Sequence, residues 1–364
     1  MAIDIINHSA VLTHEVSVML EKESPLRAGL SPFFPRETIG TNMVSTLIKK
    51  NQNFISFDVV NYGEGSYSED SKIQENLYKA PVYEHKYAFD NDSLYMTTVA
   101  KGLMNSAPAN SQIAQKALNA MRSNKNKIER AILKQQWDFA RTGIITLKNN
   151  DNIDFKRSAD SIANVTTTSG YGGVYWSNPT TAKPLTDYQK AGFYLRNIAF
   201  STARTFYSVM SSSTFNKLVQ ITEIKDLLNS RRANRAELNM PEIDLVKGMA
   251  YQGVLSTTDF EIILVTYDDF YTDPTTLAKV PFLAEDLVVN IPTDFAGKTI
   301  FAALRAKGKT NLGVEVNIPA LVEAEFTMRS FWDDMSITGG MILNSTPMVI
   351  PVDVDLIHTM KVIA

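Results

Sequence analysis

The stretch Phe200–Tyr271 decides the fold class, and it reads FSTARTFYSVMSSSTFNKLVQITEIKDLLNSRRANRAELNMPEIDLVKGMAYQGVLSTTDFEIILVTYDDFY. Within it, RTFYSVM predicts a strand, while TFNKLVQ and EIKDLL predict two short helices, the first capped by Ser212 or Ser213. DFEIILVTY predicts a buried strand, and the polar YDDFYTDPTTLAK that follows predicts a loop. Alternating helices and strands of this kind predict an α/β or α+β block with one central sheet.

The same alternation continues on both sides of this stretch. YQKAGFYLRNIAF predicts a helix before it, and FLAEDLVVNIP predicts a strand after it. The tail from Phe326 predicts further strands, split by Gly339-Gly340 and by prolines 347 and 351. The chain has no long internal repeat, which argues against a solenoid.

Residues 110–145 give the strongest helix signal in the chain. Ile113, Ala117 and Met121 recur every four residues, and the apolar stripe continues to Phe139. A continuous helix here would be roughly 50 Å long, although SNKNK in its middle predicts a weak point. A strand, ITLKNN, is expected after Gly143.

The first 50 residues predict a short helix followed by an extended arm. His8–Leu20 carries the helix pattern, and three prolines in Ser24–Glu37 oppose any further helix. Phe33 and Phe34 lie between these prolines. They are expected either to pack locally or to pack on a neighbouring subunit.

Residues 53–89 predict a long hairpin. FISFDVVNY alternates apolar and polar residues, which is the period of a half-buried strand, and LYKAPVYEHKYAF predicts the returning strand. The GEGSYSEDSKIQE between them is polar and bears glycines, which predicts a protruding loop. Residues 145–185 are polar and β-prone, and Trp176 is expected to anchor them by packing.

The bulk composition points to a soluble globular protein that does not bind nucleic acid through a general basic surplus. The chain has 364 residues, 36 Lys plus Arg against 39 Asp plus Glu, and no cysteine. Disulfides, thiolate metal sites and a cysteine nucleophile are therefore excluded. The N-terminus lacks the signal-peptide pattern and no stretch has the length of a membrane span, so cytoplasmic synthesis is expected.

No pattern in the sequence predicts catalysis. Two GKT strings, at Gly297 and Gly308, lack the first glycine of a phosphate loop, because Pro292 and Ala303 stand at that position. The four histidines have no metal-binding spacing, and no GxSxG elbow is present. The pairs Asp268-Asp269 and Asp333-Asp334 are typical of solvated turns. The sequence therefore predicts no enzyme activity, no metal and no cofactor.

The order of segments resembles the phage lambda head-protein family, the capsid protein E branch of the tailed-phage major capsid proteins with the Hong Kong 97-type fold. SPFFPRE resembles the family's entry to the extended loop, YKAPVYEHKYAF its returning strand, and WSNPTTAKPLTDY its connection into the axial domain. RRANRAEL, KGMAYQGVLSTTDFEIILV and FTMRS follow in the family order. The tail after Phe326 is longer than the family pattern, which leaves the detail of the peripheral sheet open.

The resemblance implies an α+β capsid fold with named parts. These are an N-terminal arm at residues 1–52, an extended-loop hairpin at 53–89, a spine helix with the first part of the peripheral domain at 90–186, an axial domain at 187–325, and return strands of the peripheral domain at 326–364. It implies a major head protein of a tailed double-stranded DNA bacteriophage or prophage, which assembles through pentamers and hexamers into an icosahedral shell. It also implies decoration, scaffold, portal and maturation protease proteins as partners, enclosed DNA that is not read by sequence, and localisation in the virion after assembly in the host cytoplasm.

Subunit contacts are expected from three regions. These are the arm, the hairpin tip, and the polar loop and basic turn of the axial domain, with the candidate residues Phe33, Phe34, Arg36, Tyr62, Tyr67, Lys72, Arg231, Arg232, Arg235, Asp268, Asp269 and Tyr271. The axial candidates are expected to meet their copies around a symmetry axis.

Two other classes of protein share parts of this pattern. An encapsulin-like bacterial compartment has the same fold, but the order of the motifs favours the phage family. An unrelated α/β hydrolase would need nucleophile and histidine patterns that the chain lacks.

Overall fold

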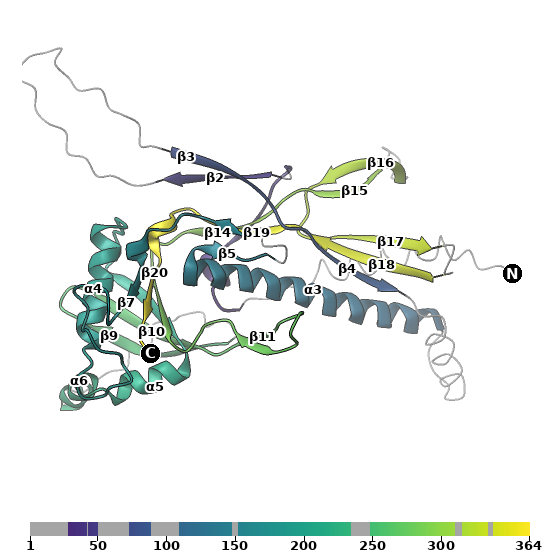
Figure 1. Cartoon of the computed structure of the whole chain (residues 1–364). Helices are drawn as coiled ribbons and strands as arrows, with labels where there is room; N and C mark the ends of the chain where they lie inside the picture. Colours follow the sequence, from purple (N-terminus) through teal and green to yellow (C-terminus); the bar gives the residue numbers. More distant parts are fainter. Residues whose placement is uncertain are drawn as a thin grey trace, which may run out of the picture.

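A computed structural model gives the structure of the chain (Figure 1). It describes residues 28–41, 43–49, 73–88, 109–147, 152–233, 248–309, 315–333 and 338–364. The expected helix at His8–Leu20 and the expected outgoing strand FISFDVVNY, at residues 54–62, lie outside these ranges. So does the expected loop between the hairpin strands, up to residue 72.

One long helix, α3 (Ala109–Thr142), runs through the molecule (Figure 1). Its inward stripe is the predicted one, and Met121, Ile128 and Phe139 are fully buried. The helix is continuous through SNKNK, where the sequence predicted a weak point, because Asn124 and Lys125 are buried. Lys125 places its ammonium 5.5 Å from the centre of the Phe326 ring.

The helix α3 ends at a glycine and is closed by a buried arginine. Gly143 has φ +75°, a backbone conformation that favours glycine, and its N–H bonds the Phe139 carbonyl at 2.8 Å. Arg157 donates a hydrogen bond to the Ala140 carbonyl at 2.8 Å. A cation at this end offsets the partial negative charge of the helix C-terminus. Short strands β5 (Ile144–Ile145) and β6 (Ile153–Asp154) pair directly after it.

A six-stranded mixed sheet forms the predicted central block, in the order β7-β20-β13-β8-β10-β9. It contains the parallel pair of β8 and β10, which are the predicted strands RTFYSVM and DFEIILVTY. The bounds of its strands are β7 (Ile162–Asn164), β8 (Thr205–Met210), β9 (Met249–Ser256), β10 (Glu261–Tyr267), β13 (Leu287–Pro292) and β20 (His358–Lys361). The sheet buries Phe206, Ile262 and Val288 in the core.

Two strands of this sheet come from segments that the sequence assigned to the peripheral domain. Strand β20 pairs antiparallel with β13, and β7 pairs parallel with β20. These pairings join residues far apart in the chain, so no local pattern predicts them. The expected domain limits stay a prediction. Strands β7 and β20, expected in the peripheral domain, lie in the same sheet as the strands of the expected axial domain.

Three helices accompany this sheet: α4 (Pro184–Asn197), α5 (Ser212–Gln220) and α6 (Thr222–Ala233). The cap of α5 is Ser211, one residue before the predicted cap, and its side chain accepts a hydrogen bond from the Thr214 N–H at 3.2 Å. Trp176 is buried, as predicted, and its indole N–H bonds the Asp187 carboxylate at 2.8 Å.

Two three-stranded sheets lie along α3. One has the order β1-β14-β19, formed by β1 (Arg36–Thr38), β14 (Gly297–Phe301) and β19 (Pro347–Pro351). The other has the order β17-β18-β4, formed by β17 (Thr327–Asp333), β18 (Thr338–Ser345) and β4 (Tyr83–Ala88). Helix α3 contacts β19, β18 and β4 (Figure 1). The predicted tail strands are thus confirmed, and the first GKT string lies in β14, with the Thr299 side chain buried.

The remaining strands form two-stranded ribbons. The first pairs β2 (Met43–Lys49) with β3 (Ile73–Lys79), so this hairpin begins ten residues before the predicted start at residue 53. The second pairs β11 (Phe270–Thr272) with β12 (Lys279–Pro281), in a region predicted to be a loop. The third pairs β15 (Leu304–Lys309) with β16 (Glu315–Val322).

Candidate assembly interface

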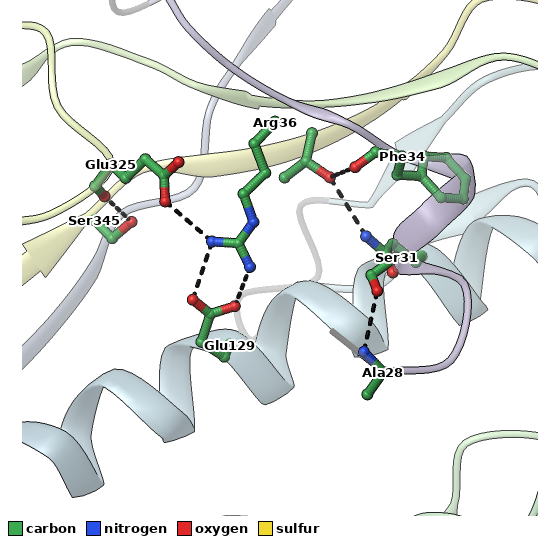
Figure 2. A network of polar contacts seen from close by, with 9 residues as sticks. Ala28, Ser31, Phe34, Arg36, Glu129, Glu325 and Ser345 are labelled. Atoms are coloured by element: carbon green, nitrogen blue, oxygen red, sulfur yellow. Dashed lines mark hydrogen bonds and ion pairs between the residues drawn. The ribbon is translucent and has the colours of Figure 1, made fainter. Parts of the chain in front are cut away.

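Arg36 is the centre of an ion-pair network that joins three distant parts of the chain (Figure 2). It lies on β1, and its guanidinium bonds both oxygens of Glu129, in the middle of α3, one of them at 3.0 Å. The same guanidinium bonds Glu325, which precedes β17, at 3.0 Å. A planar guanidinium suits this two-point contact with a carboxylate. The network therefore fixes the N-terminal segment to the helix and to the return strands.

The electrostatics of this network keep Arg36 charged. Burial lowers the pKa of Arg36, but the hydrogen bonds and charges of Glu129 and Glu325 outweigh burial and raise it overall. Glu129 is 2% exposed, and Glu325 is 37% exposed. The pair with Glu129 is thus shielded from solvent, whereas the pair with Glu325 is screened by water.

Neutral contacts hold the residues before Arg36 in place. The Ala28 N–H bonds the Ser31 hydroxyl at 3.0 Å, and the Thr299 hydroxyl donates to the Phe34 carbonyl at 3.3 Å (Figure 2). The Phe34 ring packs edge-on against Phe139 and Phe295, at centroid distances of 6.2 and 5.5 Å.

Two of the arm residues make their described contacts within their own chain. The Phe34 side chain is 1% exposed, and Arg36 pairs with two carboxylates of the same chain. Their expected contact with a neighbouring subunit stays a prediction. Phe33 is half-buried, and its ring lies 5.4 Å from that of Tyr207. Within the described part of the arm, Phe33 and Phe34 pack locally, which was one of the two expectations.

The predicted axial residues lie at the start of α5 and of β11. Asp268 is exposed, and its carboxylate accepts hydrogen bonds from the N–H and the hydroxyl of Ser212, in the first turn of α5. A carboxylate at this position stabilises the helix. Asp269 is half-buried, and Tyr271 packs against Phe282 at 5.1 Å between ring centres.

The other predicted contact residues cannot be placed by their side chains. Tyr62, Tyr67, Lys72 and Arg235 lie outside the described residues. Arg231 and Arg232 lie in the last turn of α6, where the structure describes only the backbone.

Exposed apolar side chains that the sequence did not single out mark the hairpin, the expected axial loop and one further ribbon. Leu77 on β3 is 65% exposed, and Leu277 between β11 and β12 is 77% exposed, with Phe270 half exposed beside it. Leu321 on β16 is 56% exposed. The sequence shows that these apolar residues alternate with polar ones. It does not show whether they face the core or the solvent, because that depends on strand pairings with residues distant in sequence. Apolar side chains of this size in ribbons suit contacts with another chain.

The described residues carry no arrangement for catalysis or metal binding. His358 is fully buried, bonds the Tyr171 hydroxyl at 2.9 Å, and has its pKa lowered by burial to about 3. Within the described ranges, no three His, Asp or Glu residues are grouped to hold a metal ion. No helix of the described part is long and apolar enough to cross a membrane.

Solved structures with this fold include phage capsid chains. A chain described as a prophage capsid protein from Escherichia coli CFT073 is 16% identical, covers 98% of both chains and has a TM-score of 0.63. A phage-related protein from Bordetella bronchiseptica RB50 is 12% identical, covers 97% of this chain and 96% of its own, and has a TM-score of 0.49. An encapsulin from Synechococcus elongatus PCC 7942 is 7% identical, covers 96% and 95%, and has a TM-score of 0.41. The first of these shows that the chain has the fold of a capsid protein.

No curated protein matches the sequence. The model of the family described as phage major capsid protein E matches residues 9–362, nearly the whole chain. This match agrees with the resemblance found in the sequence and separates the phage reading from the encapsulin reading. The chain belongs to the phage major capsid protein E family.

Proposed function

We propose that copies of this chain assemble through pentamers and hexamers into the icosahedral head of a tailed phage or prophage, around its double-stranded DNA. The observation that carries the proposal is the family match over residues 9–362. The capsid-protein fold and the exposed apolar ribbons support it, because a subunit of a closed shell needs several surfaces for its neighbours. The role is structural, and no described group suggests a reaction.

Within the shell, we assign contacts between subunits to the ribbons. The hairpin of β2 and β3 and the ribbon of β11 and β12 each carry apolar side chains that their own chain leaves in solvent. The residues Asp268, Asp269 and Tyr271 lie beside the second ribbon, so the expected axial contact remains a proposal there. The basic turn at Arg231, Arg232 and Arg235 is proposed for the same contact on its sequence alone.

Further partners follow from the family and not from any described contact. Decoration, scaffold, portal and maturation protease proteins would act on the assembling shell in the host cytoplasm, and the finished shell would belong to the virion. The expected division into arm, hairpin, spine helix, peripheral domain and axial domain belongs to the same proposal.

Electron microscopy of the purified full-length protein tests the proposal directly. We expect uniform closed particles, or rings of five or six subunits, when the protein is concentrated. A protein that stays monomeric over the whole concentration range, alone and with the products of neighbouring genes, would contradict it. Particles that enclose an enzyme and no nucleic acid would favour the compartment alternative.

A further inference from the structure

Helix α3 presents an exposed face that carries positive charge and no exposed carboxylate. The helix has seven Lys or Arg residues and two acidic residues, although the whole chain has a net charge of −3. Both acidic residues are buried: Glu129 pairs with Arg36, and Asp138 pairs with Lys134 and Arg141. The positive charge that remains in solvent is therefore not neutralised by the helix itself.

Lys127 and Arg130 are the centre of this basic face. Both are exposed, and neither forms an ion pair with any described residue. Lys127 donates a hydrogen bond to the neutral Asn124 side chain at 3.3 Å. His85 on β4 has its pKa lowered first by burial and then by the charge of Lys127.

The basic face points away from the sheets that α3 covers. At roughly 100° per residue, Arg130 lies about 200° around the helix from the buried Ile128. Strands β4, β18 and β19 contact the helix on its apolar side, and Figure 1 shows β4, β17 and β18 along one side of α3. On the opposite side, the helix is exposed from Asn119 to Arg130. Beyond Arg130 this side is covered, because Trp137 is buried there and stacks on Tyr267 of β10.

The neighbours of these two residues on the face are small and polar. Asn119, Ser123 and Asn126 are exposed, and none of the large exposed apolar side chains of the described residues lies on α3. An interface with another protein needs an apolar or aromatic centre, which this face lacks. Lys, Arg, Asn and Ser side chains are the groups that contact DNA phosphates, and such contacts need no apolar centre.

We propose that the exposed basic face of α3, centred on Lys127 and Arg130, contacts the phosphate backbone of the double-stranded DNA inside the shell. The inference rests on the proposed function, because it makes this face the inner side of the shell wall. The contact carries no sequence information, since it reads charge alone. The proposal gives a local DNA-binding surface to a chain whose net charge of −3 does not predict DNA binding.

Binding of a 30-base-pair DNA duplex to the full-length protein, kept below the concentration at which shells form and measured by fluorescence anisotropy across a salt series, tests this proposal. The test variant is K127Q/R130Q, and the matched control is R196Q/K225Q, which removes one exposed Arg from α4 and one exposed Lys from α6. We expect K127Q/R130Q to lower the slope of log affinity against log salt by about 2, with at least a ~10-fold loss of affinity at low salt. The control should retain the wild-type slope.

Three outcomes would overturn the proposal. One is an unchanged slope in K127Q/R130Q, and another is an equal loss in the control. The third is tighter binding of poly-glutamate of matched charge, which would identify an acidic protein segment as the partner. Electron microscopy of the concentrated wild-type protein separates the two claims. Missing shells count against the proposed function, whereas shells together with an unchanged slope in the unassembled protein overturn only the DNA contact.

Discussion

A single arginine joins parts of the chain that lie 93 and 289 residues away from it. The two carboxylates on Arg36 differ in burial, and this difference decides what each pair contributes. An ion pair shielded from water leaves an uncompensated charge when one partner is removed, while a pair in contact with solvent contributes little.

We therefore expect Glu129→Gln to destabilise the unassembled subunit by on the order of 3 kcal/mol, and Glu325→Gln by less than about 1 kcal/mol. Urea unfolding of both variants followed by fluorescence measures this difference. Arg36→Lys is the matched control, since it keeps the charge but loses the two-point geometry, and it should fall between the two. Equal losses from the two carboxylate variants would show that burial does not set the strength of the network.

Two buried titratable residues should give the subunit opposite pH dependences. Burial raises the pKa of Asp187 to about 6, although its bonds to the Gly172 N–H and the Trp176 indole oppose this shift. The folded state then binds more protons than the unfolded state between about pH 4 and 6, so this group's contribution to stability falls as the pH rises through that window. For His358, burial lowers the pKa to about 3, so the unfolded state binds more protons and stability falls as the pH drops below about 6.5.

The expected result is that Asp187→Asn makes stability rise more steeply with pH between 4 and 6, and that His358→Gln makes it rise less steeply or fall. Chemical unfolding at half-unit pH steps measures both slopes. The comparison uses slopes and not absolute stabilities, because either variant also changes a buried hydrogen bond. Two variants with the same slope as the wild type would contradict the assignment.

At the scale of elements, the ribbon of β11 and β12 combines two signs of a contact surface. Leu277 has φ +56°, a conformation that a branched apolar residue adopts at a cost, and its side chain is 77% exposed. Phe270 on the neighbouring strand is half exposed. A strained and exposed apolar side chain does not stabilise the fold of its own chain, so its burial by another subunit would explain its presence.

Leu277→Gly should leave the stability of the subunit within about 0.5 kcal/mol of the wild type, because it relieves strain and removes no core contact. The same change should raise the protein concentration at which shells form by at least about tenfold, if the side chain is buried between subunits. Light scattering against protein concentration reads this out. Val352→Gly removes another exposed apolar side chain as a control, and an equal effect there would remove the special role of the ribbon.

The sequence predicted the elements whose pattern is local. The apolar stripe of α3, the strands β8, β10 and β13 and the anchor Trp176 are all present. It missed what depends on distant partners, such as the pairing of β20 with β13 and of β1 with β14. It also placed the polar stretch of β11 and β12 in a loop, because a two-stranded ribbon outside the core has no apolar period to reveal it.

At the scale of the whole molecule, one sheet, called the wall below, joins residues 36–38 to residues 297–301 and 347–351. Strand β1 pairs in parallel with β14, and β14 pairs with β19, so Arg36 lies in the same sheet as Ile350. Ala28, Leu30 and Phe34 are buried in the continuous core that this wall helps to form. The segment from Ala28 to Arg36 therefore acts as part of the fold.

Two truncations of the chain distinguish the segment's role. Removal of residues 1–27 keeps every described contact of the segment, so we expect cooperative thermal unfolding to persist. Removal of residues 1–36 deletes Phe34 and Arg36 together, and we expect a loss of more than about 5 kcal/mol or no folded subunit. Circular dichroism during heating compares the two. A stable, cooperative protein without residues 1–36 would show that this segment is dispensable.

The sheet of β1, β14 and β19 can form only late in the synthesis of the chain. On the ribosome, residues 36–38 emerge long before residues 297–301 and 347–351, which form the rest of their sheet. Early docking is impossible, and the contacts that close the sheet are among the most non-local in the chain, which makes them slow to form. Until synthesis ends, the nascent polypeptide lacks this wall and the surfaces that it supports. If the chain assembles as proposed, we expect only finished molecules to join the particle, because truncated translation products lack this sheet.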